Sequence, residues 1–107
     1  MADESELTPS EEDTTLTANA LKAMAHPLRW RILCTLGEGE MSVGEIVEKI
    51  GTSQSNISQH LEQLRNKNIL VSRKQANRIY YSIRNSQLLM LIGEMRTVLC
   101  KVNLDDR

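Results

Sequence analysis

The chain has 107 residues, 40% of them hydrophobic and 25% charged, so it can hold one small hydrophobic core and leaves little room for a catalytic pocket. Its formal net charge of −1 hides an uneven distribution, because the first 13 residues carry six acidic side chains and no basic one. The longest apolar run is short and the N-terminus lacks a basic-then-apolar order, which predicts neither a membrane-spanning segment nor a signal peptide. We therefore expect a cytoplasmic protein whose two cysteines are kept reduced.

The N-terminal segment, residues 1–14, is acidic and rich in Ser and Thr, which is typical of a disordered tail. Regularly spaced apolar residues follow it, and we expect a single folded domain over residues 15–102 with a C-terminal tail at 103–107. Within this domain the patterns predict helices first, then two strands, then a last helix. The predicted fold is therefore mainly α with a small β-hairpin.

The first part of the domain has the pattern of a helix-turn-helix. Apolar spacing predicts helices over 15–25, 27–39 and 43–51, and a fourth helix that begins near residue 53. Gly51 suits the end of the third helix, and Thr52 or Ser53 is expected to cap the fourth. A short extended piece precedes the third helix. The buried stripe expected on the fourth helix is Ile57, Leu61 and Leu64.

The outward face of the fourth helix carries short amide and hydroxyl side chains. Such groups hydrogen-bond base edges in the major groove of B-DNA without holding the helix away from it, although an ordinary solvated face has the same composition. The residues expected to contact DNA from this helix are Gln54, Ser55, Asn56, Ser58, Gln59 and His60. For His60 two roles stay open: it reads a base, or it takes a partly buried position that packs or faces a phosphate.

A β-hairpin is predicted after the fourth helix, because the apolar spacing changes from helical to alternating over 69–74 and 78–83. The link at 75–77 is short, and its flanks are basic, as in a wing. Over residues 53–84 six basic side chains stand against one acidic side chain, which indicates a polyanionic partner. The residues expected to contact DNA outside the fourth helix's polar face are Arg65, Lys67, Arg73, Lys74, Asn77, Arg78 and Tyr80.

The last predicted helix, over 86–102, has an apolar stripe broader than a small domain can cover. Pairing with a second copy of the chain is the natural cover, so we expect a homodimer. A two-fold dimer sets its two reading helices about one turn of DNA apart. The expected partner is therefore double-stranded DNA that contains an inverted repeat.

Three segments closely resemble the bacterial ArsR/SmtB family of winged helix-turn-helix repressors: LKAMAHPLRWRILCTL, EMSVGEIVEKIGTSQSNISQHLEQLRNKNIL and RKQANRIYYSI. The resemblance covers residues 16–102, and the pattern SQSxxSQHLxxLR is specific to that group. It implies the element order α-α-α-α-β-β-α and a homodimer built from the first and last helices. It also implies a transcriptional repressor, and no cofactor is expected because the sequence contains no cofactor motif.

Many members of this family sense metals, but the usual ligands are missing from this chain. Ser42 and Gly44 stand in the segment MSVGEI, where arsenic and heavy-metal sensors carry cysteines. The last helix contains Glu94 and no histidine, whereas zinc-responsive members place Asp and His ligands there. We therefore expect no metal site, and the lack of any nucleophile–base set or cofactor motif predicts that the protein is not an enzyme.

The cysteine pair, Cys34 and Cys100, makes the chain similar to the dithiol branch of the family, the HlyU-, BigR- and SqrR-like regulators. That resemblance implies that reactive sulfur species or an oxidant links the two thiols by a disulfide or polysulfide and so releases the repressor from DNA. Arg31 and Arg96 lie one turn before the cysteines and would favour the thiolates if they point the same way. The alternative is a metal-responsive or constitutive repressor in which both cysteines only pack as small hydrophobes.

Overall fold

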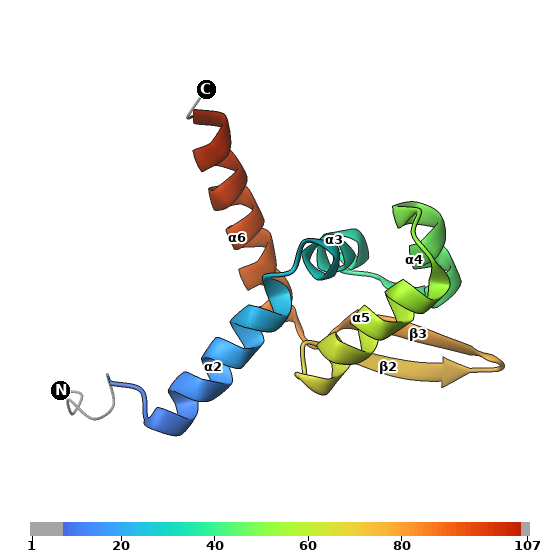
Figure 1. The fold of residues 1–107 in the computed structure, drawn as a ribbon, viewed down its shortest axis with the longest axis horizontal. Coiled ribbons are helices and arrows are strands. Elements are labelled where there is room, and N and C mark those ends of the chain that lie inside the picture. Colours follow the sequence, from blue (N-terminus) through green and yellow to red (C-terminus); the bar gives the residue numbers. More distant parts are fainter. Residues whose placement is uncertain (1–7, 106–107) are drawn as a thin grey trace.

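The computed structural model describes the backbone of residues 8–105 and the side chains of residues 8–100. It has the mainly helical winged helix-turn-helix architecture that the sequence predicts, with a small antiparallel sheet (Figure 1). The elements are α2 Glu11–Met24, α3 Pro27–Leu36, β1 Glu40–Ser42, α4 Val43–Ile50, α5 Gln54–Asn66, β2 Leu70–Gln75, β3 Arg78–Ile83 and α6 Ser86–Asp105. No helix within 8–105 is long and apolar enough to cross a membrane.

Helix α2 begins at Glu11, so residues 11–14 are helical and not part of a disordered tail as expected. The Ser10 hydroxyl caps the helix by accepting the Asp13 backbone N–H at 3.0 Å. Acidic side chains in a first turn favour the positive end of the helix dipole, which is why this acidic sequence folds as a helix start. At the other end of the chain α6 runs to Asp105, past the expected boundary at residue 102, while residues 1–7 lie outside the described residues.

The helix-turn-helix is formed by α4 and α5. Ser42 and Glu45 form a capping box at the start of α4, and Gly51, at φ 84°, ends it in the left-handed conformation that glycine adopts without strain. Ser53 then caps α5 by accepting the Asn56 backbone N–H at 3.2 Å. The start of the fourth helix and its capping by Ser53, one of the two expected candidates, are therefore confirmed.

The hydrophobic core lies between α5, α3 and the sheet. Ile57, Leu61 and Leu64 are fully buried along one side of α5, as the helical spacing predicts. Ile32 and Leu33 of α3 are equally buried and face them within the same cluster. Burial of this stripe leaves the opposite side of α5 on the molecular surface.

The sheet has three antiparallel strands in the order β1-β3-β2. Strands β2 and β3 form the predicted wing, with Gln75 paired to Arg78 beside the turn and Ala76 at φ 56° within it. The short extended piece expected before the third helix becomes β1, which pairs with β3 through Ser42 and Tyr80 among others. This added strand ties the wing to the base of the helix-turn-helix.

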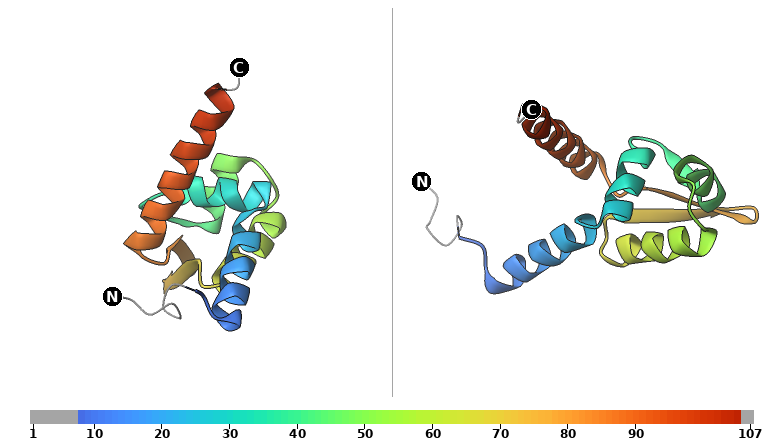
Figure 2. Two further views of the ribbon diagram at one scale, coloured as in Figure 1. Left: turned by 90° about the vertical axis from the view of Figure 1, so that its left-hand side faces the viewer. Right: turned by 45° about the horizontal axis from the view of Figure 1, so that its top comes forward.

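Helices α2 and α6 project from the winged part of the molecule (Figure 2). Ile92 anchors α6 in the core at 3% exposure, whereas Leu91, Val98 and Leu99 of the same helix are each more than half exposed. Leu16 on α2 is 62% exposed. The two helices thus carry large apolar side chains that the rest of the chain leaves uncovered.

Candidate nucleic-acid interface

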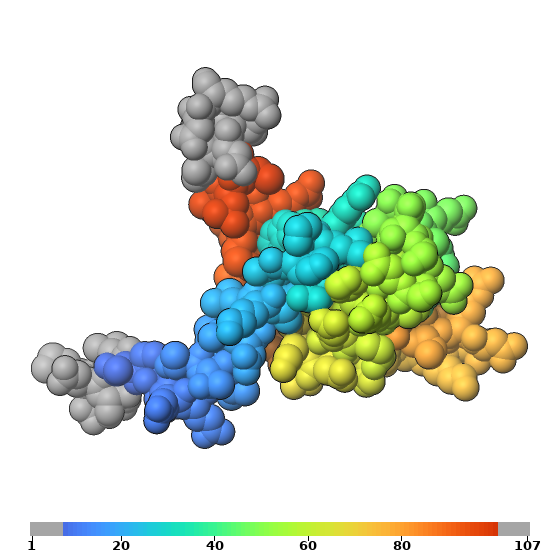
Figure 3. Space-filling view, in the orientation of Figure 1, coloured from blue at the N-terminus to red at the C-terminus, as the bar shows by residue number. Residues whose placement is uncertain are grey.

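The surface side of α5 carries most of the predicted reading residues. Gln54, Ser55 and Gln59 are exposed, and Ser58 is half-buried beside them. Asn56 is turned back to the helix start, where its side-chain amide donates to the Thr52 hydroxyl at 3.2 Å. Figure 3 shows α5 and the wing side by side on one face of the molecule.

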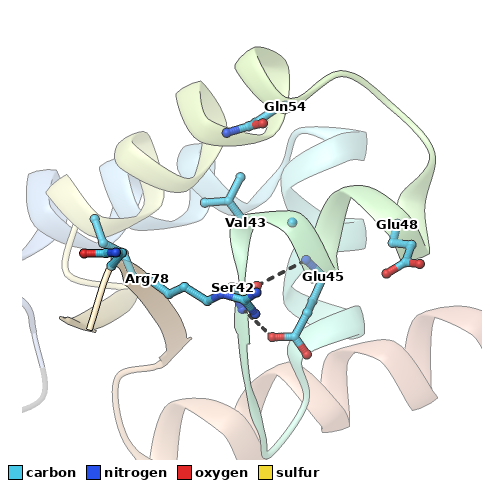
Figure 4. A pocket seen from close by; sticks show the side chains of 9 residues that line it. Ser42, Val43, Glu45, Glu48, Gln54 and Arg78 are labelled. Carbon is cyan, nitrogen blue, oxygen red and sulfur yellow. Dashed lines mark hydrogen bonds between the residues drawn. The ribbon is translucent and has the colours of Figure 1, made fainter. Parts of the chain in front are cut away.

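A groove of about 550 Å³ separates the start of α5 from the wing (Figure 4). Gln54 lines it from α5, Asn77 and Arg78 line it from the wing, and Glu45 and Glu48 line it from α4. Hydrogen bonds from the Ser42 backbone and hydroxyl hold the pKa of Glu45 below its usual range, and the charge of Arg78 acts in the same direction. The α4 side of the groove is therefore anionic, so a DNA phosphate is favoured only on the wing side.

Within the wing, Arg73 is bound to other residues of the protein. Its guanidinium makes a bidentate ion pair with Glu40 of β1, in which Nε lies 2.9 Å from Oε2. It also donates to Gln75 Oε1 at 2.6 Å and lies over the Tyr80 ring, 4.9 Å from its centroid. Arg73 therefore links β2 to β1 across the intervening strand β3, where it lies over Tyr80.

The predicted phosphate contacts fall into two groups. Arg65 is paired in a bidentate manner with Glu62, its Nη2 2.7 Å from Oε2, and Arg73 is paired with Glu40. Within the part of the chain that the structure describes these are the two ion pairs, so Lys67, Lys74 and Arg78 are in none, although Arg78 lines the groove with Glu45 and its charge acts on that carboxylate. The excess of basic over acidic residues counted within 53–84 is therefore larger than the positive charge that is free to bind phosphate. Glu40, which pairs with Arg73, lies before residue 53 and was not counted.

We expect Lys74→Ala to lower the slope of log affinity against log salt by about 0.9, the value for one lost phosphate contact, on any duplex. Arg73→Ala, the neighbouring position on the same strand, is expected to leave that slope unchanged because its charge is already offset by Glu40. Fluorescence anisotropy with a nonspecific duplex at several salt concentrations measures both slopes. Equal losses in the two variants would contradict the distinction.

His60 takes the packed position of its two expected roles. Its ring stacks on His26 with centroids 4.5 Å apart and planes tilted by 35°, and its Nδ1 lies 3.1 Å from Arg29 Nη1. Burial lowers the pKa of His60, and the nearby His26 and Arg29 lower it further. Arg29 and His26 were not among the predicted functional residues, because nothing in their own segment relates them to a residue on α5.

The two cysteines belong to neighbouring helices. Cys34 of α3 is half-buried, Cys100 of α6 is exposed, and both are free thiols. Burial raises the pKa of the Cys34 thiol, the charge of Arg96 lowers it, and the charge of Cys100 raises it again. The arginine that favours the thiolate of Cys34 is therefore Arg96 of α6 and not the expected Arg31 of α3, and burial outweighs its effect.

No group of three His, Cys, Asp or Glu side chains that could hold a metal ion occurs among the described residues. The interface is thus formed by a polar helix face, a basic wing and a packed helix-turn-helix, with the thiols away from it on α3 and α6. These features define a winged helix-turn-helix DNA-binding regulator. Comparison with known proteins gives the same class and its family.

Residues 26–72 match the family model described as bacterial regulatory protein, arsR family. The biofilm growth-associated repressor of Xylella fastidiosa is 39% identical over 83 residues, which are 78% of this chain and 73% of the relative. The structure of HlyU from Vibrio cholerae superimposes with a TM-score of 0.78 at 34% identity, over 85% of this chain and 99% of that one. The crystal structure of the repressor BigR from Xylella fastidiosa gives 0.75 at 33% identity, over 92% and 98%.

The chain therefore belongs to the ArsR family of bacterial regulatory proteins, in the branch that contains HlyU and BigR. It is a transcriptional regulator with a DNA-binding domain and not an enzyme, as the sequence predicts. The identity of 39% with the Xylella relative spans the helix-turn-helix and the wing together, so the family assignment covers the whole interface described above.

Proposed function

We propose that this protein is a homodimeric repressor of transcription in the bacterial cytoplasm, which binds an inverted repeat in double-stranded DNA. We further propose that crosslinking of Cys34 and Cys100 by reactive sulfur species or another oxidant releases it. The observation that carries DNA binding is the surface on which the exposed polar side of α5 adjoins the wing cations Lys74 and Arg78, neither of which forms an ion pair within the described residues. The relative from Xylella fastidiosa, named as a repressor, supports the direction of control.

Sequence reading falls to α5, because an α-helix fits the major groove and amide side chains can bond two positions on one adenine. Gln54 and Gln59 are the exposed amides on that helix, and Ser55 and Ser58 supply hydroxyls beside them. Lys67, Lys74 and Arg78 act on phosphates, which sets the register of the helix in the groove and makes affinity fall with salt. Asn77 acts at the wing tip next to Arg78.

Dimer formation is supported by an apolar groove of about 410 Å³ between α2, α3 and α6. Its lining residues are Leu21, Met24, Ala25, Pro27, Trp30, Met95 and Leu99. Leu21 is 50% and Leu99 57% exposed, and side chains of this size favour removal from water by a second copy of the same two helices. The two-fold arrangement then presents both α5 helices to one duplex.

The thiol switch is supported by the proximity of the two cysteines, because Cys100 of α6 is close enough to Cys34 of α3 for its charge to raise the pKa of the Cys34 thiol. In the proposed reaction two S–H bonds break, one S–S bond forms, and the oxidant takes up two protons and two electrons. A link between α3 and α6 alters the helix that carries the dimer surface, so it changes the separation of the reading helices. Cys34 has a raised pKa, which favours the constitutive alternative in which it only packs.

Selection from a random-sequence duplex library tests the DNA-binding part. The wild-type protein is expected to enrich an imperfect inverted repeat and to bind it as one dimer per duplex, with a mass of twice 12.1 kDa for the protein component. Sedimentation equilibrium of the free protein and of the complex gives both masses. A monomeric protein, or a library that shows no enrichment, contradicts the proposal.

A further inference from the structure

The polar contact between the reading helix and α3, beside their apolar packing, is made by two imidazoles and one guanidinium, here called the histidine–arginine cluster: His26, Arg29 and His60. His26 is the N-cap residue of α3, and its Nδ1 accepts the Leu28 backbone N–H at 3.1 Å. Arg29 Nη1 reaches both His60 Nδ1 at 3.1 Å and Gln63 Oε1 at 2.6 Å on α5. One side chain of α3 therefore binds two successive turns of the reading helix.

The protonation state of the cluster follows from its hydrogen bonds. A guanidinium carries donors and no acceptor, so Nδ1 of His60 must present a lone pair to Arg29. Nδ1 of His26 must do the same for the Leu28 amide. Both rings are thus neutral and carry their proton on Nε2.

Protonation of either ring removes one of these bonds and adds a positive charge. The new charge would lie beside Arg29 and 4.5 Å from the other imidazole. Lys22 of α2 and Lys67 after α5 line the groove next to Arg29, and that groove contains no acidic side chain. Glu62, the carboxylate adjacent in sequence, is paired with Arg65, and no charge from α4 or β2 acts on His60 among the described residues.

We propose that His26, Arg29 and His60 are positioning residues for the reading helix, and that they fix α5 for DNA binding only while both imidazoles are neutral. Burial lowers the pKa of His60, so the folded state binds fewer protons than the unfolded state as the pH falls through the ordinary histidine range. The contribution of neutral His60 to the free energy of unfolding is therefore fully present above pH 6.5, the ordinary histidine value. It decreases as the pH falls from that value to the lower pKa of His60 in the folded state. The effect on DNA affinity rests on the DNA-binding function proposed above.

The expected pH dependence has an unusual sign. Acidification adds positive charge to a protein, and positive charge strengthens its attraction to DNA. The affinity of a basic interface for DNA is therefore normally unchanged or higher at lower pH. Here acidification is expected to release the reading helix from α3 and to weaken binding. The sign of the effect therefore separates the cluster from a general electrostatic contribution.

NMR titration of the free wild-type protein is the first test. The chain has 2 histidines, so both imidazoles give assignable signals. Both rings are expected as Nε2–H tautomers, with the pKa of His60 below that of an exposed histidine. A His60 that carries its proton on Nδ1, or that titrates at or above the ordinary value, overturns the proposal without reference to DNA.

The pH profile of DNA binding is the second test, with the duplex enriched in the selection as probe. From about pH 7.5 to about pH 5.5 the wild-type affinity is expected to fall, because protonation of His60 removes the lone pair that accepts from Arg29. The matched variants are His26→Asn and His60→Asn, singly and together, because Asn keeps an acceptor near the Nδ1 position, caps helices and does not titrate. The double variant lacks the contact between the two rings, so it is expected to bind less tightly than wild type at the higher pH, and its affinity is expected to change by less than about twofold between the two pH values.

A flat wild-type profile, or an equal fall in the double variant, overturns the proposal. Circular dichroism at both pH values verifies that each protein is folded during the measurement. If the library yields no enriched duplex, the proposed function fails, and the NMR titration still decides the state of the cluster.

Discussion

The Gln54→Ala, Ser58→Ala double variant is expected to lose its preference for the selected inverted repeat, while it keeps salt-sensitive binding to any duplex. Both side chains lie on the surface side of α5, and the buried stripe of that helix is untouched by the change. Each well-placed side-chain contact to a base contributes about 1–3 kcal/mol of discrimination, so the double change lowers the specificity ratio by about 30-fold or more. Competition binding with selected and scrambled duplexes measures that ratio.

The matched control is the double variant Ser86→Ala, Gln87→Ala, which changes one Ser and one Gln on α6 to alanine. Both positions are exposed and belong to the first turn of that helix, which carries none of the predicted DNA contacts. The Asn85 side chain, which accepts the Leu88 backbone N–H at 2.9 Å, remains to cap the helix. This control is expected to keep the wild-type specificity ratio, and an undiminished ratio in the α5 variant would show that another surface reads the sequence.

Much of the interface is predictable because its determinants are local. Ser53 caps α5 from within one turn, Gly51 ends α4 through its own backbone angle, and the buried stripe of α5 follows from spacing along one helix. The hairpin follows from alternation on either side of a short turn. Each of these features depends on residues a few positions apart, which is the range over which sequence patterns carry information.

The remaining features depend on contacts between distant segments. Glu40 and Arg73 are 33 positions apart and meet only because β1 lies beside β3, so the loss of Arg73 as a free cation was not predictable from the charge pattern. Arg29 and His60 are 31 positions apart and meet through the packing of α3 on α5. The predicted disorder of residues 11–14 was wrong for another reason. Acidic residues are common both in disordered segments and at helix N-termini, and here the Ser10 cap favours the helix.

The two ion pairs and the histidine–arginine cluster divide the basic residues of this surface into those bound to other residues of the protein and those that are not. Arg29 and Arg73 hold elements in place through internal partners, whereas Lys74 and Arg78 are exposed and form no ion pair within the described residues. A fixed framework matters for sequence reading, because a reading helix that shifts by a fraction of a residue loses its bidentate contacts. We therefore expect the internal arginines to contribute to the specificity of DNA binding, and Lys74 and Arg78 to its affinity.

The wild-type protein treated with diamide or polysulfide is expected to leave its selected duplex, whereas Cys34→Ser treated in the same way stays bound. A coupling of about 1–3 kcal/mol between the crosslink and DNA binding corresponds to a loss of affinity of about 5- to 150-fold. In the reduced state Cys34→Ser is expected to bind as wild type, because both cysteines lie on helices outside the interface. Anisotropy before and after treatment measures each affinity, and equal release of the two proteins would refute the switch.

The chemistry of the crosslink gives an independent check on the same prediction. Because Cys100 is exposed and Cys34 is half-buried, the oxidant is expected to meet Cys100 first, and Cys34 then closes the link. The attacking species is a thiolate, and the pKa of Cys34 is raised by burial, so the closing step should accelerate as the pH rises above neutral. Mass spectrometry of samples quenched over time gives that rate, and the Cys100→Ser protein is the control that cannot close the link. A product in which Cys100 is joined to Cys100 of a second subunit, with Cys34 still free, would mean that the cysteine on α3 only packs and that the regulator does not respond through an internal crosslink.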